Sequence, residues 1–327
     1  MQWNVRAYQP GDEIQILELF KRVFGYERSL AHWRWKFLEN PAGQQITLAA
    51  GDDGSIIGQF AGLPVVAATH RESLLLTQGI DHMVDASMRR KGIYRAMARH
   101  FFQTFVNPTH AIAWFAFPVP ANFDIEVKAF GCQGLQQVPN LVWDLSKREL
   151  WGPSLRHSWR YRVDHVKRFG AAIDGLWSDC SREYSLATVR NSRYLNWRYA
   201  DRPDVDYKLM VVSDQLSDRT IGLAVMRFGW FDEPVAPMVD WMVRADDLEA
   251  ARVLLSHCHD LAREKGLAAT RAWFPDYAPQ RDLLVSLGYR VETSRLHILS
   301  ARDSEGSEVL KALREGFYYT MGDADIY

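Results

Sequence analysis

A short basic turn that contains a glycine is the first place where this sequence could do chemistry. Arg89, Arg90, Lys91 and Gly92 stand between an apolar, strand-like run and a helical pattern. The first turn of a helix presents unpaired N–H groups and a partial positive charge, and glycine lets an anion approach the backbone closely. Arginine and lysine add charge-assisted hydrogen bonds. The turn therefore suits a diphosphate, and a solvated basic loop is the alternative.

Periodicity predicts the strand and the helix that must position this turn. The predicted order is two helices, consecutive strands, and then alternating helices and strands, which makes a mixed sheet covered on both faces, an α+β or α/β unit. The predicted helices lie at about 12–25, around His32 to Trp35, at 92–105 and at 121–130, and the predicted strands at about 45–50, 55–66, 72–77, 79–85, 110–117 and 135–145.

The same motifs occur twice in the same order and at a nearly constant offset. The paired segments are Trp35–Pro41 with Trp197–Pro203, Asp81–Asp85 with Asp240–Arg244, and Phe117-Pro118 with Phe274-Pro275, the last pair followed by Gly131 and Gly288. The offset is far longer than a solenoid period, so it indicates a duplicated domain. A segment rich in charge, Gly and Pro between Leu145 and Arg156 marks the boundary, which gives domains of residues 1–148 and 149–327.

Composition excludes several classes of protein. The chain has 327 residues, of which 47% are hydrophobic, and this is enough for packed cores. Its net charge of -1 gives no global basic field, so we expect no nucleic-acid partner. Three scattered cysteines are too few for a disulfide framework and favour a reducing, cytoplasmic setting. No apolar run is long enough to predict a membrane span.

The turn and its context resemble the GNAT acyltransferase superfamily. In that family the fourth strand leads into an Arg/Gln-x-x-Gly-x-Gly/Ala loop, and here Arg89-x-x-Gly92-x-Tyr94 follows Val84-Asp85. Tyr94 stands where Gly or Ala is commoner, and Arg90 replaces a usual glycine. With the duplication, the whole chain is similar to a tandem-GNAT protein. This implies two domains, each with a mixed, largely antiparallel sheet flanked by helices.

The resemblance also implies a cosubstrate and an acceptor. The cosubstrate is acetyl-CoA or another acyl-CoA, and the acceptor is a small-molecule amine, with an amino sugar as a guess. The backbones of Met83 and Val84 should bind the pantetheine arm. The diphosphate would be held by Arg89, Arg90, Lys91, Gly92, Ile93 and Tyr94.

Acyl transfer to an amine calls for a base, an oxyanion donor and an acid for the leaving thiolate. The resemblance puts the oxyanion donor at a backbone N–H near Met83 or Val84, and the base at Asp81 or His82 in an otherwise apolar strand. Asp240 recurs at the Asp81 position in the second copy, which favours a structural role for Asp81. Trp241 replaces His82 there, so His82 is the better candidate.

The usual acid of this family is a tyrosine shortly before the Phe-Gly pair, and Val127 occupies that position. Asp124 or Glu126 would then serve as the acid, or the thiolate would leave without one. We take Glu126 as the candidate.

The second copy lacks the basic turn. Asp246 and Asp247 stand at the corresponding helix start, where carboxylates cap a helix and repel a diphosphate. We expect the second domain to bind no coenzyme.

The acidic, aromatic C-terminal segment, with Tyr318 and Asp323, would receive a cationic amine, or it is a last strand with a solvated end. His257, Cys258 and His259 are adjacent, and adjacent residues of a helix point apart. We therefore predict no metal site.

Two other functions fit parts of this pattern. A Fem-type aminoacyltransferase also pairs two such domains, but the near-zero charge and the lack of a Lys-rich helical arm disfavour it. A non-catalytic acyl-CoA-binding regulatory module would tolerate Tyr94, Val127 and the missing second turn.

Overall fold

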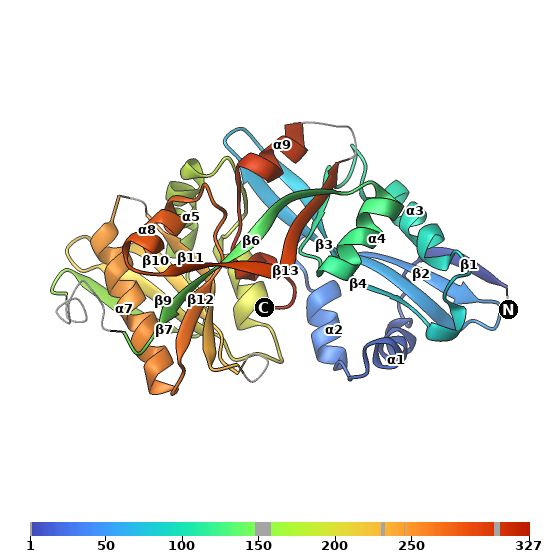
Figure 1. The fold of residues 1–327 in the computed structure, drawn as a ribbon, viewed down its shortest axis with the longest axis horizontal. Coiled ribbons are helices and arrows are strands. Elements are labelled where there is room, and N and C mark those ends of the chain that lie inside the picture. The colour runs from blue at the N-terminus through green and yellow to red at the C-terminus, as the bar shows by residue number, and fades with distance from the viewer. Residues whose placement is uncertain (1, 148–157, 230–232, 245, 304–307) are drawn as a thin grey trace. The chain divides into compact units, whose positions relative to one another are not determined.

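The computed structural model describes residues 2–147, 158–229, 233–244, 246–303 and 308–327. The chain divides into two compact units (Figure 1). Unit 1 comprises Met1–Ala67, Ser73–Gln136 and Ile298–Arg314, and unit 2 comprises Ala68–Glu72, Gln137–His297 and Glu315–Tyr327.

Unit 1 begins with a strand and two helices and continues into alternating strands and helices. The elements are β1 (Trp3–Ala7), α1 (Glu13–Phe24), α2 (Leu30–Phe37), β2 (Gln45–Gly51), β3 (Ile56–Thr69), β4 (Ser73–Val84), a 3-10 turn (Ala86–Met88), α3 (Ile93–Phe105), β5 (Ala113–Ala116) and α4 (Pro120–Phe130). All but the last residue of α9 (Glu308–Glu315) also belongs to unit 1.

The sheet of unit 1 has the order β1-β2-β3-β4-β5-β13, where β13 is Arg290–Asp303. Its neighbours are antiparallel at β1/β2, β2/β3 and β5/β13, and parallel at β4/β5. Helices α1 and α2 lie on one face, and α3 lies on the other (Figure 1). The expected mixed, largely antiparallel sheet flanked by helices is confirmed.

Two details of the expected strand pattern are wrong. The separate strands expected at 72–77 and 79–85 form the single strand β4, because Gly79 at the expected break continues the strand. A Cβ at Gly79 would overlap the Trp114 ring, so glycine is needed there for packing and not for a turn. The short strand β1 was not predicted, although its sequence WNVRA alternates between apolar and polar residues, because only five residues carry this pattern.

The elements of unit 2 are β6 (Gln133–Asp144), β7 (Tyr161–Val166), α5 (Ala172–Cys180), a 3-10 turn (Ser181–Glu183), β8 (Leu186–Thr188), α6 (Ser192–Leu195), a π-helical turn (Asn196–Ala200), β9 (Lys208–Asp214), β10 (Arg219–Met226), β11 (Val235–Val243), α7 (Leu248–Glu264), β12 (Ala269–Ala272), α8 (Pro279–Ser286), β14 (Phe317–Tyr318) and a last 3-10 turn (Met321–Asp323). From β7 to α8, unit 2 repeats the order of elements of unit 1, with the short strand β8 inserted between two helices and β14 added near the C-terminus.

The strand order of unit 2 is β7-β9-β10-β11-β12-β6, which matches that of unit 1 strand for strand. The pairs β7/β9, β9/β10, β10/β11 and β12/β6 are antiparallel, and β11/β12 is parallel. The helix α7 follows β11 as α3 follows β4. The element that precedes α7 is therefore the counterpart of the basic turn.

The last strand of each unit comes from the other half of the chain. Residues 300–303 of β13 pair with β5 in unit 1, and residues 141–144 of β6 pair with β12 in unit 2. The two units therefore differ from the two domains expected from the sequence, which meet between residues 148 and 149. That domain boundary remains a prediction. Most of the proposed boundary segment, residues 148–157, lies outside the described residues.

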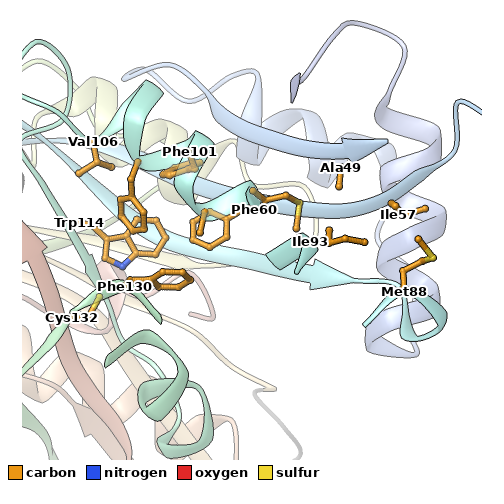
Figure 2. Close-up of a cluster of buried hydrophobic side chains, with 13 residues drawn as sticks. Ala49, Ile57, Phe60, Met88, Ile93, Phe101, Val106, Trp114, Phe130 and Cys132 are labelled. Carbon is orange, nitrogen blue, oxygen red and sulfur yellow. The ribbon is translucent and has the colours of Figure 1, made fainter. Parts of the chain in front are cut away.

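The core of unit 1 gathers around the face of the sheet that α3 covers. Phe60 of β3 and Trp114 of β5 meet there with Phe101 of α3 and Phe130 of α4 (Figure 2). These aromatic rings are at most 6% exposed. Among the described residues, no helix combines the length and the apolar character that crossing a membrane requires.

Candidate active site

A cavity of about 910 Å³ opens in unit 1 between the end of β4, the basic turn, α3 and α4. Its walls include residues from three separate stretches of sequence, which the fold brings together. Of the predicted site residues, those that line it are His82, Met83, Val84, Arg89, Arg90, Gly92, Ile93, Tyr94 and Glu126. Asp81 and Lys91 are not among its lining residues.

The carboxylate of Asp81 forms a buried ion-pair cluster away from the cavity. It pairs with Arg28 and with Lys36, whose Nζ is 3.3 Å from the carboxylate, and all three side chains are at most 8% exposed. Burial alone would raise the pKa of Asp81, but the two cations outweigh it and hold the pKa well below its usual range. Asp81 is thus a stable anion held by structural partners.

The backbone at Asp81 departs from regular strand geometry. Its φ is 48°, in the left-handed region that favours glycine, and Gln59 Nε2 donates to its carbonyl oxygen over 3.1 Å. Such an irregularity re-aims the residues that follow it in a strand. Here those residues are His82, Met83 and Val84, which line the cavity.

The basic turn wraps the start of α3. Arg90 (φ 65°) and Gly92 (φ 80°) are both left-handed, which is strained for arginine, and strain of this kind concentrates at functional sites. Gly92 is the N-cap, and no side chain in the described part of the chain caps the helix. The first N–H groups of α3 therefore lie at the cavity wall. Lys91 contacts Met88 through its Nζ instead.

His82 is held in an aromatic stack at the inner end of the cavity. Its ring centroid is 4.0 Å from that of Phe60 and 5.3 Å from that of Trp114, with nearly parallel planes. Its Nε2 atom is buried, and the hydroxyl of Tyr94 lies 3.4 Å from its Nδ1. A proton that passes between His82 and the cavity therefore has a route through Nδ1 and the Tyr94 hydroxyl.

Glu126 is the buried carboxyl group of this cavity. It lies on α4 and is 5% exposed. Burial raises its pKa to about 7, and the nearby Ser300 hydroxyl opposes part of the shift. Burial, followed by the Glu126 charge, also raises the pKa of Cys132 to about 12 and raises that of Tyr94. At neutral pH, Glu126 can therefore hold or release a proton while Tyr94 and Cys132 keep theirs.

Several lining residues were not predicted from the sequence. Val23 comes from α1, Arg95 from the first turn of α3, and Ile125 and Lys128 from α4. The position of Arg95 beside the basic turn is a signal that could have identified it. Nothing in the sequence near Val23, Ile125 or Lys128 indicates that they reach the same cavity.

The corresponding turn of unit 2 is closed by its own carboxylates. Asp247 caps α7 by accepting from the Ala250 N–H over 2.9 Å, and the Tyr161 hydroxyl donates to the same carboxylate over 2.6 Å. Asp246 pairs with Arg244 at 3.0 Å. The helix start that is uncapped in unit 1 is thus capped by an anionic side chain in unit 2.

Tyr318 and Asp323, predicted to bind substrate, are buried within unit 2. Asp323 Oδ2 accepts from Arg190 Nη2 over 2.5 Å, and Tyr318 donates its hydroxyl to the Trp241 carbonyl over 2.7 Å. The two side chains are at most 5% exposed. These contacts indicate that both side chains hold the C-terminal segment in place.

The His257–His259 segment shows no metal-site geometry. His259 Nε2 is 2.8 Å from the Tyr289 hydroxyl, and Cys258 is a buried free thiol. In the part of the chain that the structure describes, no three potential ligands of the His, Cys, Asp or Glu type converge on one point.

Comparison with known proteins identifies the class of this domain. Residues 4–125 match the family model described as "Acetyltransferase (GNAT) domain". This part of the chain therefore belongs to the GNAT superfamily, as the basic turn indicated. A search of curated proteins gives no match.

Solved structures extend the likeness over nearly the whole chain. A probable N-acyltransferase from Enterococcus faecalis V583 has a TM-score of 0.69 at 13% identity, covering 97% of this chain and 75% of that one. A tandem GNAT protein from the clavulanic acid biosynthesis pathway has a TM-score of 0.58 at 13% identity, covering 94% of this chain and all of the other. The chain thus has the tandem-GNAT fold.

N-myristoyltransferase from Saccharomyces cerevisiae, solved with bound myristoyl-CoA, also shares this fold. Its TM-score is 0.57 at 9% identity, and the match covers 94% of this chain and 80% of that one. A fold that accommodates so long an acyl group in one protein does not by itself fix the acyl length in another.

Proposed function

We propose that unit 1 is an acyl-CoA-dependent N-acyltransferase that transfers an acetyl or similar group to a primary amine. The observation that carries this proposal is one cavity with two chemically different ends. Its outer end has the uncapped start of α3 with Arg89 and Arg90, and its inner end has Glu126, Tyr94 and His82. An elongated cosubstrate with an anionic diphosphate and a reactive thioester matches that polarity.

Binding would use the basic end for charge and the strand for alignment. The N–H groups at the start of α3 and the guanidinium groups of Arg89 and Arg90 hold the diphosphate. The backbone of Met83 and Val84, at the end of β4, holds the pantetheine arm as an added strand would be held. This places the thioester beside His82, Tyr94 and Glu126.

The residues at the inner end of the cavity would carry the two proton transfers of the reaction. The attacking amine must lose a proton, and the leaving thiolate must gain one. We assign the first role to His82, whose Nδ1 reaches the cavity through the Tyr94 hydroxyl. We assign the second to Glu126, since a carboxyl group with a pKa of about 7 retains a proton to donate near neutral pH.

The acceptor in this proposal is a small-molecule amine, and an amino sugar is one such amine. Unit 2 takes no coenzyme in the proposal, because Asp247 already occupies the start of α7. We assign its buried residues Tyr318 and Asp323 to holding the C-terminal segment and not to the acceptor. The cytoplasmic location expected from the cysteine content stays a prediction.

A transfer assay tests the proposal. The full chain is incubated with acetyl-CoA and a panel of amines that includes amino sugars, and the released CoA thiol is measured. We expect turnover with at least one amine, and we expect Glu126→Gln to lower kcat by roughly 10² or more. Asp124→Asn is the matched control, because Asp124 also lines the cavity but is exposed.

The outcomes separate the proposal from its rivals. Binding of acetyl-CoA without transfer over the whole panel would favour a non-catalytic acyl-CoA-binding module. Transfer from an aminoacyl-tRNA without any acetyl-CoA binding would favour a Fem-type aminoacyltransferase. Full turnover by Glu126→Gln would remove Glu126 from the mechanism while leaving the class of reaction standing.

A further inference from the structure

The inner end of the cavity is closed by His82 together with Phe60 and Trp114, two aromatic residues that the proposed reaction does not use. The parallel pairing of β4 with β5 joins Leu76–Gln78 to Ala113–Phe115 and goes no further along β4. Gly79 follows directly. The space beside Gly79 is filled by the indole of Trp114, which a Cβ at Gly79 would overlap.

The Trp114 ring continues into a stack. Its centroid lies 5.5 Å from that of Phe60 and 5.3 Å from that of His82, and the planes of both pairs are within 28° of parallel. Phe60 and Trp114 are each 0% exposed, whereas His82 lines the cavity. The three rings thus form a wall in which His82 lies on the cavity side and Phe60 and Trp114 lie in the core, where Figure 2 shows these two rings within the buried cluster.

The core residues behind these three rings leave the rings no space to move into. Phe101 and Phe102 pack edge-on against Trp114 with centroids 5.7 and 5.4 Å away, and all of these rings belong to one buried cluster. Protein interiors are packed as densely as organic crystals, so an inserted methylene group forces neighbours out of their preferred rotamers.

We propose that the wall formed by Phe60, His82 and Trp114 limits the acyl group to a short one, acetyl or propionyl. This rests on the proposed function, which puts the thioester next to His82. A chain that continues past the thioester carbonyl meets the face of the His82 ring, and the buried rings of Phe60 and Trp114 prevent that ring from moving aside.

A longer acyl chain should therefore raise the affinity for acyl-CoA in an open site and lower it in a closed one. If the cavity had room along this direction, each added methylene group would tighten binding by roughly fourfold. With the wall in place, affinity and turnover fall once the chain is too long. The sign of the trend decides between the two cases.

The experiment uses the full chain with CoA, acetyl-, propionyl-, butyryl-, hexanoyl- and octanoyl-CoA. Affinity is measured by calorimetry, and kcat/KM with one amine by thiol release. We expect kcat/KM to fall by about tenfold or more between propionyl- and butyryl-CoA, the discrimination that a methylene group gives in a closed apolar site. Equal or rising values up to hexanoyl-CoA would overturn the inference.

Variants test which residues form the wall. Trp114→Phe should move the limit to butyryl- or hexanoyl-CoA, and Phe60→Leu should act in the same direction if Trp114→Phe fails to fold. Trp143→Phe is the matched control, because Trp143 is a buried tryptophan of unit 2 that stacks on His259. If Trp143→Phe shifts acyl selectivity as much as Trp114→Phe does, the wall is not the cause.

The same data separate this inference from the proposed function. Binding of CoA with no dependence on acyl length contradicts the wall and leaves the N-acyltransferase standing. No binding of CoA or any acyl-CoA contradicts the proposed function, and the inference then falls with it.

Discussion

For single residues, the surroundings of each carboxyl group determine the direction in which its pKa is shifted. Asp81 is held as an anion by Arg28 and Lys36, whereas Glu126 is buried without a cation of comparable effect on its pKa. The pKa of one is lowered and that of the other is raised to about 7. Divergent pKa values of this kind are how active sites assign proton-transfer roles.

The raised pKa of Glu126 predicts a pH-dependent cost to stability. The pKa is about 7 in the folded chain against an ordinary value of 4.5, so the folded state binds more protons between these pH values. Its stability therefore falls as the pH rises through this window, by at most about 3 kcal/mol. Glu126→Gln removes the cost, so the variant should match the wild type at pH 4.5 and exceed its stability at pH 8.

Urea unfolding at both pH values measures this difference, and Asp124→Asn serves as the control because its carboxyl group is exposed. A stability difference between Glu126→Gln and the wild type that is the same at pH 4.5 and pH 8 would contradict the assignment.

The basic turn could be predicted from the sequence, whereas the burial of Glu126 and the pairing of Asp81 could not. The turn from Arg89 to Gly92 is a local feature, since a strand, a basic turn and a helix follow one another along the chain. The pKa of Glu126 depends on its burial and on the hydroxyl of Ser300, which is far away in sequence. The exclusion of Asp81 from the cavity likewise depends on Arg28 and Lys36, which belong to the α1–α2 region.

At the scale of elements, the C-terminal segment of unit 2 is held by buried charge. Arg190 Nε donates to Asp240 over 2.9 Å, and its Nη2 donates to Asp323 and Thr320. The Nη2 atom of Arg198 donates to the Ala324 carbonyl over 3.0 Å. This network lies within the core, and in it the single cation Arg190 compensates the two carboxylates of Asp240 and Asp323.

Arg190→Met should therefore destabilise unit 2 strongly. It leaves Asp240 and Asp323 buried together without their cation, and breaking such a pair costs about 3 to 5 kcal/mol. Thermal unfolding measures the loss, and Asp240→Asn with Asp323→Asn in the same chain should recover part of it.

Arg168→Met is the matched control for this network. Arg168 pairs with Asp201 at the surface, where removing an ion pair changes stability little. Similar small losses in Arg190→Met and Arg168→Met would show that the buried network does not hold the segment.

The elements themselves were largely predictable. Helical periodicity gave α1 and α3 within a residue or two, because their apolar faces pack on the sheet. The expected break between two strands within β4 was wrong. The sequence alone does not show whether a glycine ends a strand or makes room for a neighbouring ring, as Gly79 does for Trp114. The burial of Tyr318 and Asp323 was not predicted, because the sequence does not show whether a tyrosine or an aspartate is exposed or is buried with a hydrogen-bond partner.

At the scale of the whole molecule, the two units share a strand order but differ in charge where a diphosphate would bind. Unit 1 has Arg89 and Arg90 before an uncapped helix, and unit 2 has Asp247 as the cap. The repeated motifs allowed the duplication to be predicted. The exchange of the last strands was not predictable, because strand pairing between residues far apart leaves no mark in a local pattern.

We propose that one chain binds one acyl-CoA, and that it does so at the basic turn of unit 1. Calorimetric titration of acetyl-CoA into the full chain should give one site. Gly92→Asp, which puts a carboxylate at the start of α3, should weaken binding by at least about tenfold, or 1.4 kcal/mol. Gly266→Asp is the control, because Gly266 has the same left-handed backbone and lies in unit 2. Two sites per chain, or equal affinity in the wild type and Gly92→Asp, would contradict the claim.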